Sequence, residues 1–362
     1  MEDASSIEIL AYPSPAVSQL TRLRGAVGRL VPGVAMATAI AVGATFLGRL
    51  APVVGAPVIA IVAGIVISAL RSPAASARIG LDFTAKRVLQ ASIVVLGLNL
   101  SLHQVLVTGA ASLPVLAGTL VGALAGAYFI GRRLKLHRDL ATLIGVGTAI
   151  CGASAIAATE AVIDAEDADV AYAIATIFTF NVVAVLLYPT LGHLMGLSQH
   201  AFGLWAGTAI NDVSSVVAAS SVYGHAATAY AVVVKLARTL ALLPIAFVLS
   251  ALRRRGGANS ALEPALAREQ RRGQLRKAVP TFLFVFVAAV IVNTAGLIPL
   301  HWHGPLDNLA TWMITAALAA IGLSTRFRDL RRTGPRPMVL GAALWAIVGV
   351  TSLLLQLATG TI

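Results

Sequence analysis

Three charged residues lie inside long apolar stretches of this chain: Asp212, Lys235 and Arg238. Charged side chains at membrane depth are rare, and they usually mark a binding site or an ion pathway. Lys235 and Arg238 are three residues apart, so they share one face of a helix. Two cations beside one carboxylate leave a surplus positive charge, and the guanidinium fork of Arg238 matches carboxylate, sulfate or phosphate oxygens. The cluster therefore predicts a site for a small anion.

The same residues allow other interpretations. An ion pair between Asp212 and either Lys235 or Arg238 would simply hold two helices together. Alternatively, Asp212 would carry a coupling proton, or would ligate a sodium ion together with Asn211. Asn181, in the middle of another apolar stretch, is a third candidate for the coupling-ion site, although it is equally suited to joining two helices.

Two runs rich in glycine, serine and threonine interrupt the apolar pattern, at 145–154 and 203–215. Both contain Gly-Thr-Ala-Ile and a later serine, at a constant offset of sixty residues. Glycine weakens helices, and unpaired backbone groups are tolerated in a membrane only where they line a polar cavity. We therefore expect residues 147–154 and 208–215 to be non-helical at mid-membrane and to face each other across a cavity. The broken helices would present their N-termini and hydroxyls to an anion. With the two cations, the substrate-binding candidates are Gly147, Thr148, Ser154, Thr208, Asn211, Ser214, Ser215 and, at the end of another stretch, Asn99.

The composition excludes a water-soluble protein. Of the 362 residues, 58% are hydrophobic and only 12% are charged, about half the charged share of a soluble domain; the mean hydropathy is +0.86. The single cysteine, Cys151, excludes an intrachain disulfide framework and a Cys-rich metal site. The net charge of +12 has no folded polar domain to carry it, which argues against nucleic-acid binding. The chain is predicted to be an integral membrane protein.

Stretches long enough to cross a bilayer as helices predict about eleven transmembrane spans in an all-α protein. Their approximate ranges are 29–49, 54–70, 84–101, 109–131, 139–161, 168–192, 199–221, 226–252, 279–298, 305–325 and 338–359. Residues 1–28 lack an apolar core, so we expect a short cytoplasmic tail rather than a signal sequence. Residues 29–359 then form a single transmembrane domain, with 253–278 as a basic cytoplasmic loop.

Lysine and arginine gather in every second loop of this arrangement, and only Arg49 falls in a loop on the other side. Because cytoplasmic loops retain an excess of these residues, the pattern predicts an N-terminus inside and a C-terminus outside. It also explains most of the net charge. An error in one span would move every later loop to the opposite side of the membrane and destroy the pattern.

The function classes can then be compared. A membrane enzyme needs a nucleophile and base, or a metal, within reach; no His or Cys set offers this at membrane depth, so we expect no enzyme, no metal and no other cofactor. An anion channel is an alternative, but broken helices around buried charges favour an occluded site over an open pore. A transporter of a small anion, in contact with membrane lipid and coupled to Na⁺ or H⁺, is the leading interpretation; a homodimer stays open.

Several short motifs together resemble the YeiH-like family of bacterial inner-membrane proteins, which its name describes as sulfate exporters. They are Gly-Leu-Asn-Leu-Ser-Leu (97–102), Gly-Thr-Ala-Ile-Cys-Gly-Ala-Ser-Ala-Ile-Ala-Ala (147–158), Ala-Gly-Thr-Ala-Ile-Asn-Asp (206–212), Val-Lys-Leu-Ala-Arg (234–238) and Ile-Gly-Leu-Ser-Thr (321–325). The likeness extends over nearly all the spans. It implies a secondary transporter related to sodium symporters and antiporters, with inverted five-helix repeats, crossed and broken helices, and one domain moving against a scaffold. Eleven spans allow the repeats to be one to five and six to ten, or two to six and seven to eleven. Sulfate, sulfite, a sulfonate or a carboxylate all suit such a site.

Overall fold

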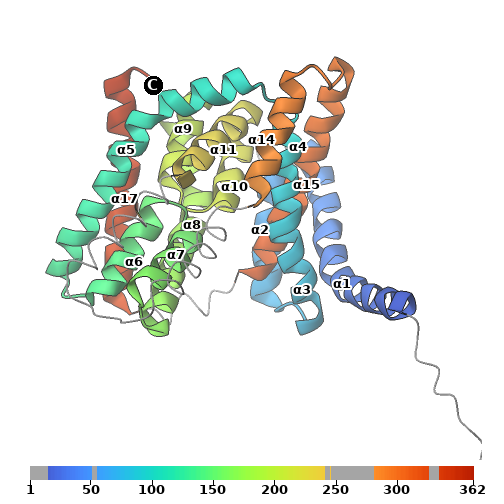
Figure 1. The fold of residues 1–362 in the computed structure, drawn as a ribbon, viewed down its shortest axis with the longest axis horizontal. Helices are drawn as coiled ribbons and strands as arrows, with labels where there is room; N and C mark the ends of the chain where they lie inside the picture. Colours follow the sequence, from blue (N-terminus) through green and yellow to red (C-terminus); the bar gives the residue numbers. More distant parts are fainter. Residues whose placement is uncertain (1–14, 51–54, 241–244, 246–280, 326–333) are drawn as a thin grey trace, which may run out of the picture.

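Helices make up nearly all of the computed structural model, which describes residues 15–50, 55–240, 245, 281–325 and 334–362. No strand occurs within these residues, so the all-α prediction is confirmed for them. Two groups of helices lie side by side (Figure 1). The scaffold body contains α1 (Pro15–Leu50), α2 (Ala56–Leu70), α3 (Ala75–Phe83), the π-helical turn η1 (Thr84–Val88), α4 (Leu89–Gly97), α14 (Thr281–Thr294), η2 (Leu300–Trp302) and α15 (His303–Ser324). The hairpin body contains α5 (Leu102–Arg133), α6 (Arg138–Ala149), α7 (Ala153–Ile163), α8 (Asp167–Leu194), α9 (Gln199–Ala209), α10 (Val213–Tyr223), α11 (His225–Leu240) and α17 (Pro335–Thr359).

Five helical segments are long and apolar enough to cross a membrane. They are Gly28–Leu50, Leu102–Arg133, Asp167–Leu194, Leu300–Ser324 and Pro335–Thr359. Large apolar side chains on their surfaces, such as Phe46, Phe129 and Leu354, are exposed, as expected for helices that face lipid. Transmembrane helices are therefore a property of this chain. Residues 241–244 and 246–252 of the expected span 226–252, and the basic loop 253–278, lie outside the described residues.

Glycines allow close helix contacts in both bodies. In the hairpin body, Gly118, Gly122 and Gly126 of α5 face α17, where an added Cβ would meet the side chains of Leu355, Thr351 and Leu344. In the scaffold body, Gly64 of α2 packs on Gly322 of α15, with only 3.0 Å between the Cβ position of one and the Cα of the other. Small residues permit such contacts because association in lipid depends on van der Waals packing.

The expected span 139–161 does not cross the molecule. It forms a hairpin, α6 and α7, that enters and leaves at one end, the lower end in Figure 1. His137, just before α6, contacts Asp169, in the first turn of the helix after the hairpin, with 2.6 Å between Nδ1 and Oδ2. The two ends of the stretch are therefore neighbours, and the prediction of a transmembrane crossing is wrong here.

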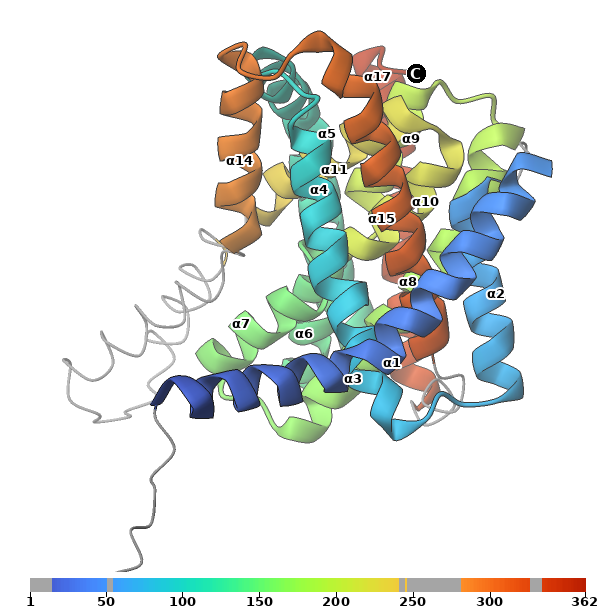
Figure 2. The same ribbon diagram turned by 90° about the vertical axis from the view of Figure 1, so that its right-hand side faces the viewer.

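The expected span 199–221 forms a second hairpin, α9 and α10, which enters from the opposite end of the molecule (Figures 1 and 2). The Tyr223 hydroxyl, at the end of α10, donates to the Leu197 carbonyl, just before α9, over 2.5 Å. The Gln199 side chain accepts a hydrogen bond from the Ala227 N–H in the first turn of α11. As a result, the turns at 164–166 and 195–198 change sides relative to the eleven-span arrangement, while the other fully described turns between helices keep theirs.

Candidate functional site

The tips of the two hairpins touch in the middle of the hairpin body. The backbone is non-helical at 150–152 and at 210–212, shorter interruptions than the predicted 147–154 and 208–215. Gly152 has a φ of +69°, which favours glycine. A Cβ at Gly152 would lie 3.7 Å from the Asp212 Cβ and 3.3 Å from Ile177 of α8. The hairpins therefore meet in direct contact, without the intervening cavity that the sequence predicted.

Lys235 and Arg238, both on α11, bind the carbonyl groups at which α6 and α9 end. The Lys235 ammonium donates to the carbonyls of Ile150, at 3.0 Å, and Ile210, at 2.6 Å. These two residues occupy equivalent positions at the two tips. We call the two cations and the carbonyls that they bind the staple.

Arg238 completes the staple. Its Nε donates to Ala149 O at 2.7 Å, one terminal nitrogen donates to Thr148 O at 2.8 Å, and the other donates to Thr208 O. The last carbonyls of a helix have no partner within it, and such groups are costly to leave unpaired in an apolar interior. Cations also interact favourably with the negative end of a helix dipole. The staple thus makes two helix breaks stable deep in the protein.

The sequence allowed the two cations either to bind an anion or to pair with Asp212, and these contacts correspond to neither. Lys235 is 0% and Arg238 1% exposed, so neither presents a free nitrogen to a ligand in this structure. Within the described residues the sole ion pair is His137–Asp169, so the alternative pairing of Asp212 with Lys235 or Arg238 is also not formed. The expected cluster of three charges is present around the tips, but its members bind backbone and hydroxyl groups.

Asp212 caps the N-terminus of α10. Its Oδ1 accepts the Ser215 N–H at 2.8 Å and the Ser214 hydroxyl at 2.5 Å, while its Oδ2 accepts the Ser215 hydroxyl at 2.6 Å. Aspartate is a preferred N-cap because its carboxylate satisfies free N–H groups and opposes the positive end of the helix dipole. The carboxylate is only partly buried. Asp212, Ser214 and Ser215 therefore form one compact acidic cap.

Asn181 and Asn211 join α8 to the second tip. The Asn211 N–H donates to Asn181 Oδ1 at 3.1 Å, which also fixes the orientation of that amide. Asn181 Nδ2 and Asn211 Oδ1 are buried without a hydrogen-bond partner, and the residues are 2% and 1% exposed. Unpaired buried polar atoms are uncommon, so the junction holds one spare donor group and one spare acceptor.

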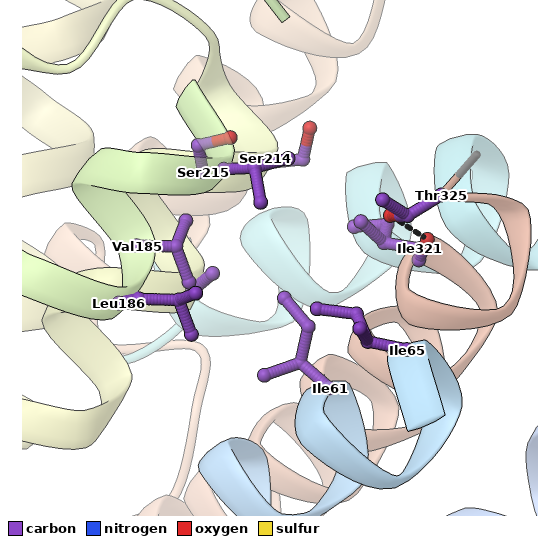
Figure 3. Close-up of a pocket in the computed structure, with 10 residues that line it drawn as sticks. Ile61, Ile65, Val185, Leu186, Ser214, Ser215, Ile321 and Thr325 are labelled. Carbon is purple, nitrogen blue, oxygen red and sulfur yellow. Dashed lines mark hydrogen bonds between the residues drawn. The ribbon is translucent and has the colours of Figure 1, made fainter. Parts of the chain in front are cut away.

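A small cavity of about 20 Å³ lies between the two bodies. Figure 3 shows Ser214 and Ser215 on one side of it and Ile61, Ile65 and Thr325 on the other. It has room for about one water molecule. Ser214 and Ser215 thus border a cavity at the boundary between the bodies.

The remaining predicted site residues separate into two groups. Gly147, Thr148 and Thr208 are buried; the two threonine hydroxyls donate to carbonyls four residues earlier, and Gly147 allows α6 to pack on Ile156 of α7. Ser154 is exposed in the first turn of α7. Asn99 is far from the tips: its Nδ2 bonds to Asp307 Oδ1 at 2.6 Å, between α4 and α15. The prediction that Asn99 joins the site is wrong in this structure.

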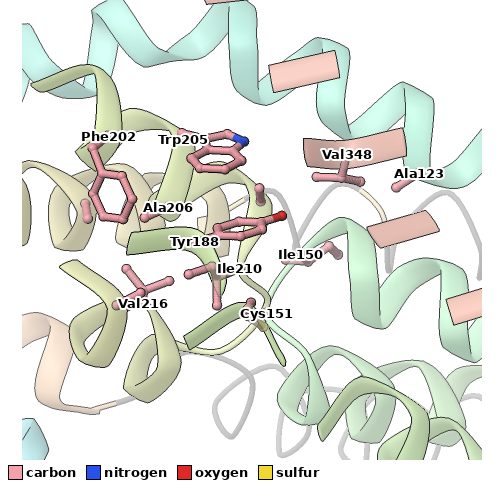
Figure 4. Close-up of a cluster of buried hydrophobic side chains, with 14 of the residues drawn as sticks. Ala123, Ile150, Cys151, Tyr188, Phe202, Trp205, Ala206, Ile210, Val216 and Val348 are labelled. Carbon is pink, nitrogen blue, oxygen red and sulfur yellow. The ribbon is translucent and has the colours of Figure 1, made fainter. Parts of the chain in front are cut away.

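Sequence reasoning missed the aromatic packing that supports the tips. Tyr188 stacks on Trp205, with ring centroids 4.1 Å apart, and both lie in the same buried cluster as Ile150 and Ile210 (Figure 4). It also missed Ser352 of α17, whose hydroxyl lies 2.6 Å from that of Thr208. Isolated aromatic and serine residues in apolar helices gave no signal. No group of three or more His, Cys, Asp or Glu able to hold a metal occurs among the residues described.

Comparison with known proteins identifies the family. The family model described as conserved hypothetical protein 698 matches residues 32–341. A UPF0324 membrane protein of Streptococcus pyogenes serotype M18 is 41% identical over 340 residues, covering 92% of this chain and 98% of that protein. A UPF0324 membrane protein of Clostridium tetani is 36% identical over 336 residues, covering 91% and 97%. No solved structure matches the chain. The chain therefore belongs to the conserved hypothetical protein 698 family, together with the UPF0324 membrane proteins.

Proposed function

We propose that this protein is a secondary active transporter of a small anion in the bacterial inner membrane. The observation that carries this proposal is the meeting of two broken-helix hairpins that enter from opposite ends. Transporters place substrate and coupling-ion sites near the bilayer midplane, at interrupted helices contributed by repeats of opposite topology. Irregular backbone at that depth is tolerated only where it is buried in protein or lines a cavity, and here the staple satisfies it.

The topology follows from the two hairpins. We assign one membrane crossing each to α1, α2, α3–α4, α5, α8, α11, α14, α15 and α17, and we assign the hairpins to opposite sides of the membrane. Five of these helices are long and apolar enough to span by themselves. The N-terminus is inside and the C-terminus outside, because the positively charged loops keep their positions. This arrangement of nine crossings and two hairpins among the described helices replaces the eleven crossings expected from the sequence.

The repeat is shorter than the five-helix unit that the YeiH-like resemblance implies. α6 ends at Ala149 and α9 at Ala209, and α7 (Ala153–Ile163) matches α10 (Val213–Tyr223) residue for residue. The turns before the hairpins match as well: Lys135 and Gly196 both have positive φ values. Because α5 and α8 run in opposite directions, the units α5–α7 and α8–α10 form an inverted pair. Four of the five carbonyls in the staple form matched pairs, Thr148 with Thr208 and Ile150 with Ile210, so the staple joins equivalent positions of the two units.

Transport requires that the site open alternately to each side, and the boundary between the two bodies offers the surface for that motion. Both bodies contribute to one buried apolar cluster at this boundary, with Val217 and Val233 from the hairpin body and Ile314 and Phe286 from the scaffold body. Such a surface can slide without breaking ion pairs. An anion channel is the weaker alternative, because the small cavity at the tips is not a continuous pore. The site offers no nucleophile with a base, so we propose no catalysis.

Coupling is assigned to the acidic cap and the neighbouring amides. Asp212 is the acid nearest the tips, and the unpaired Asn211 Oδ1 is a suitable ligand for Na⁺ or partner for a proton. Lys235 and Arg238 supply positive charge near the site through the staple, without direct contact. Sulfate, suggested by the family resemblance, stands beside sulfite, sulfonates and carboxylates as a substrate class.

Reconstituted vesicles test the proposal. Purified protein in liposomes should catalyse exchange of a labelled anion from a panel of sulfate, sulfite, sulfonates and carboxylates, and accumulate it when a pH or Na⁺ gradient is imposed. Asp212→Asn keeps a good N-cap but removes the charge, so it should retain exchange and lose gradient-driven accumulation. Current that follows the anion gradient alone would identify a channel, and absence of flux for the whole panel would contradict anion transport.

A further inference from the structure

The two hairpin tips differ at one matched position. Sixty residues separate Gly152 from Asp212, and each is the N-cap of the second helix of its hairpin. At α10 the Asp212 carboxylate fills the N-terminal position. At α7 the corresponding residue, Gly152, has no side chain. The Ala155 N–H donates instead to the Gly152 backbone carbonyl at 3.1 Å. The N-terminus of α7 therefore lacks the carboxylate that its counterpart has.

The donors that hold Asp212 have counterparts around this position. The Ser214 hydroxyl donates to Asp212 Oδ1, and its match in α7 is Ser154, which is exposed and has no recorded side-chain partner among the described residues. In α7 the Ala155 and Ile156 N–H groups bond the Gly152 carbonyl, so only the first two N–H groups of the helix, those of Ala153 and Ser154, are without an intrahelical partner. Ser154 is thus placed to donate to an external anion as Ser214 donates to an internal one.

An unpaired amide provides independent evidence for a ligand. Asn181 Nδ2 is buried without a partner, and the side chain is 2% exposed. Its Oδ1 binds the N–H of Asn211, whose backbone lies 3.8 Å from the Cβ position of Gly152. Ile177, one turn earlier on the same face of α8, also touches that position. The amide therefore lies beside the vacant N-terminus, and its spare group is a donor, which suits an anion.

We propose that the carboxylate of a small organic monoanion binds at the N-terminus of α7, in the place corresponding to that of the Asp212 carboxylate at α10. This inference rests on the proposed transport function and specifies its substrate class. The site supplies Ser154, the Asn181 amide and the positive end of one helix, which is equivalent to about half an elementary charge. Lys235 and Arg238 are bonded to carbonyls, and Asp212 remains nearby as a negative charge. The two cations and Asp212 together leave a formal net charge of +1 around the tips, so one negative charge on the ligand is compensated, whereas the second charge of sulfate is not.

Thermal unfolding of the purified protein in detergent tests the site. The probes are sodium acetate, methanesulfonate and sulfate at equal ionic strength, with acetamide as the neutral analogue of acetate. A ligand that binds the folded form raises its unfolding temperature by mass action. We expect a saturable rise with acetate and none with acetamide. Sulfate stabilises proteins generally by exclusion from their surface, so its effect should not saturate.

Two variants and one control locate the binding. Asn181→Asp keeps the acceptor for Asn211 but loses the donors and adds a negative charge. Ser154→Ala removes the matched hydroxyl from an exposed position, so its fold should be intact. Either should weaken acetate binding about tenfold or more, the loss expected for a hydrogen bond to a charged group. Ser221→Ala, which removes a hydroxyl bonded to the Ala218 carbonyl away from the tip, should bind acetate normally.

Each result supports or overturns the assignment. Acetate stabilisation that Ser154→Ala and Asn181→Asp both retain would overturn the site, even if the protein transports anions. No saturable effect of acetate, or a saturable effect of methanesulfonate or sulfate alone, would overturn the carboxylate class. Binding that follows the expected pattern, without flux in vesicles, would leave the site correct and contradict the transport function.

Discussion

The hairpin body and the scaffold body bury helix backbone in an apolar environment in different ways. In the hairpin body, two helices stop midway, and a few polar side chains satisfy the exposed backbone groups. In the scaffold body, α3, η1 and α4 follow one another without a break, and glycine contacts such as Gly64 on Gly322 bring helices together. The stability of the hairpin body therefore depends on individual hydrogen bonds, whereas that of the scaffold body depends on close packing between helices.

Removal of the staple should destabilise the folded protein most strongly, because the hairpin body depends on these hydrogen bonds. Arg238→Gln loses the guanidinium that binds three carbonyls, and each buried polar group left unpaired costs about 1–3 kcal/mol. Lys235→Gln loses contacts to two carbonyls. We expect both variants to lose folded, monodisperse protein in size-exclusion chromatography, with Arg238→Gln the more severe.

The staple prediction has a direct control. Arg87→Gln changes an arginine of η1 whose side chain forms no hydrogen bond to the part of the chain that the structure describes, so it should leave the elution profile and unfolding temperature nearly unchanged. If Arg238→Gln and Lys235→Gln fold as well as Arg87→Gln but fail to bind anions, the cations act as ligands, as the sequence suggested, and the staple is not needed for folding.

The breaks themselves were predictable from sequence. Glycine, serine and threonine at mid-span, the sixty-residue offset and the three buried charges all predicted that 145–154 and 203–215 work together. The structure brings those segments into contact, with Asp212, Lys235 and Arg238 around them. Sequence patterns could not show that the cations bind carbonyls, because the number of free carbonyls depends on where each helix ends. Asn99 was misplaced because a polar residue at a helix end carries no information about its partner across the fold, here Asp307.

The hairpins were not predictable from charge, for a specific reason. Replacing two crossings by two hairpins moves only the turns at 164–166 and 195–198 to the other side. Neither turn contains Lys or Arg, and acidic residues contribute little to the orientation rule. The two errors compensate, so every basic loop keeps its side. The length of the apolar stretch does not distinguish the two cases either, because a hairpin of two short helices contains as many apolar residues as one spanning helix.

A single methyl group should distinguish close packing in the scaffold body from ordinary helix surface. A Cβ at Gly64 would lie 2.6 Å from the Ala319 carbonyl oxygen and 2.9 Å from the Leu323 nitrogen, both backbone atoms of α15. Gly64→Ala should therefore lower stability by about 1–3 kcal/mol, as overpacking does. Gly43→Ala is the matched control on α1, because its Cβ meets nothing within 4 Å; alanine should be neutral or slightly stabilising there. Equal unfolding temperatures for the two variants would mean that α2 and α15 separate easily.

The smallest expected effect concerns the contact that closes the base of the first hairpin. The hydrogen bond to Asp169 raises the pKa of His137 above 6.5, and the charges of Asp169, Asp139 and Glu166 add to the rise, while burial opposes it. A raised pKa means that the folded state holds the proton more tightly than the unfolded state. The stabilisation is therefore complete below about pH 6.5 and is lost as the pH rises through the pKa of the folded protein. Because the imidazole is largely exposed, solvent screening keeps the contribution small. His137→Ala should lower the unfolding temperature by at most about 2 °C at pH 5.5 and by less at pH 8.5. A difference that grows with pH would contradict the bond to Asp169, and with it the evidence that both ends of this hairpin lie on the same side.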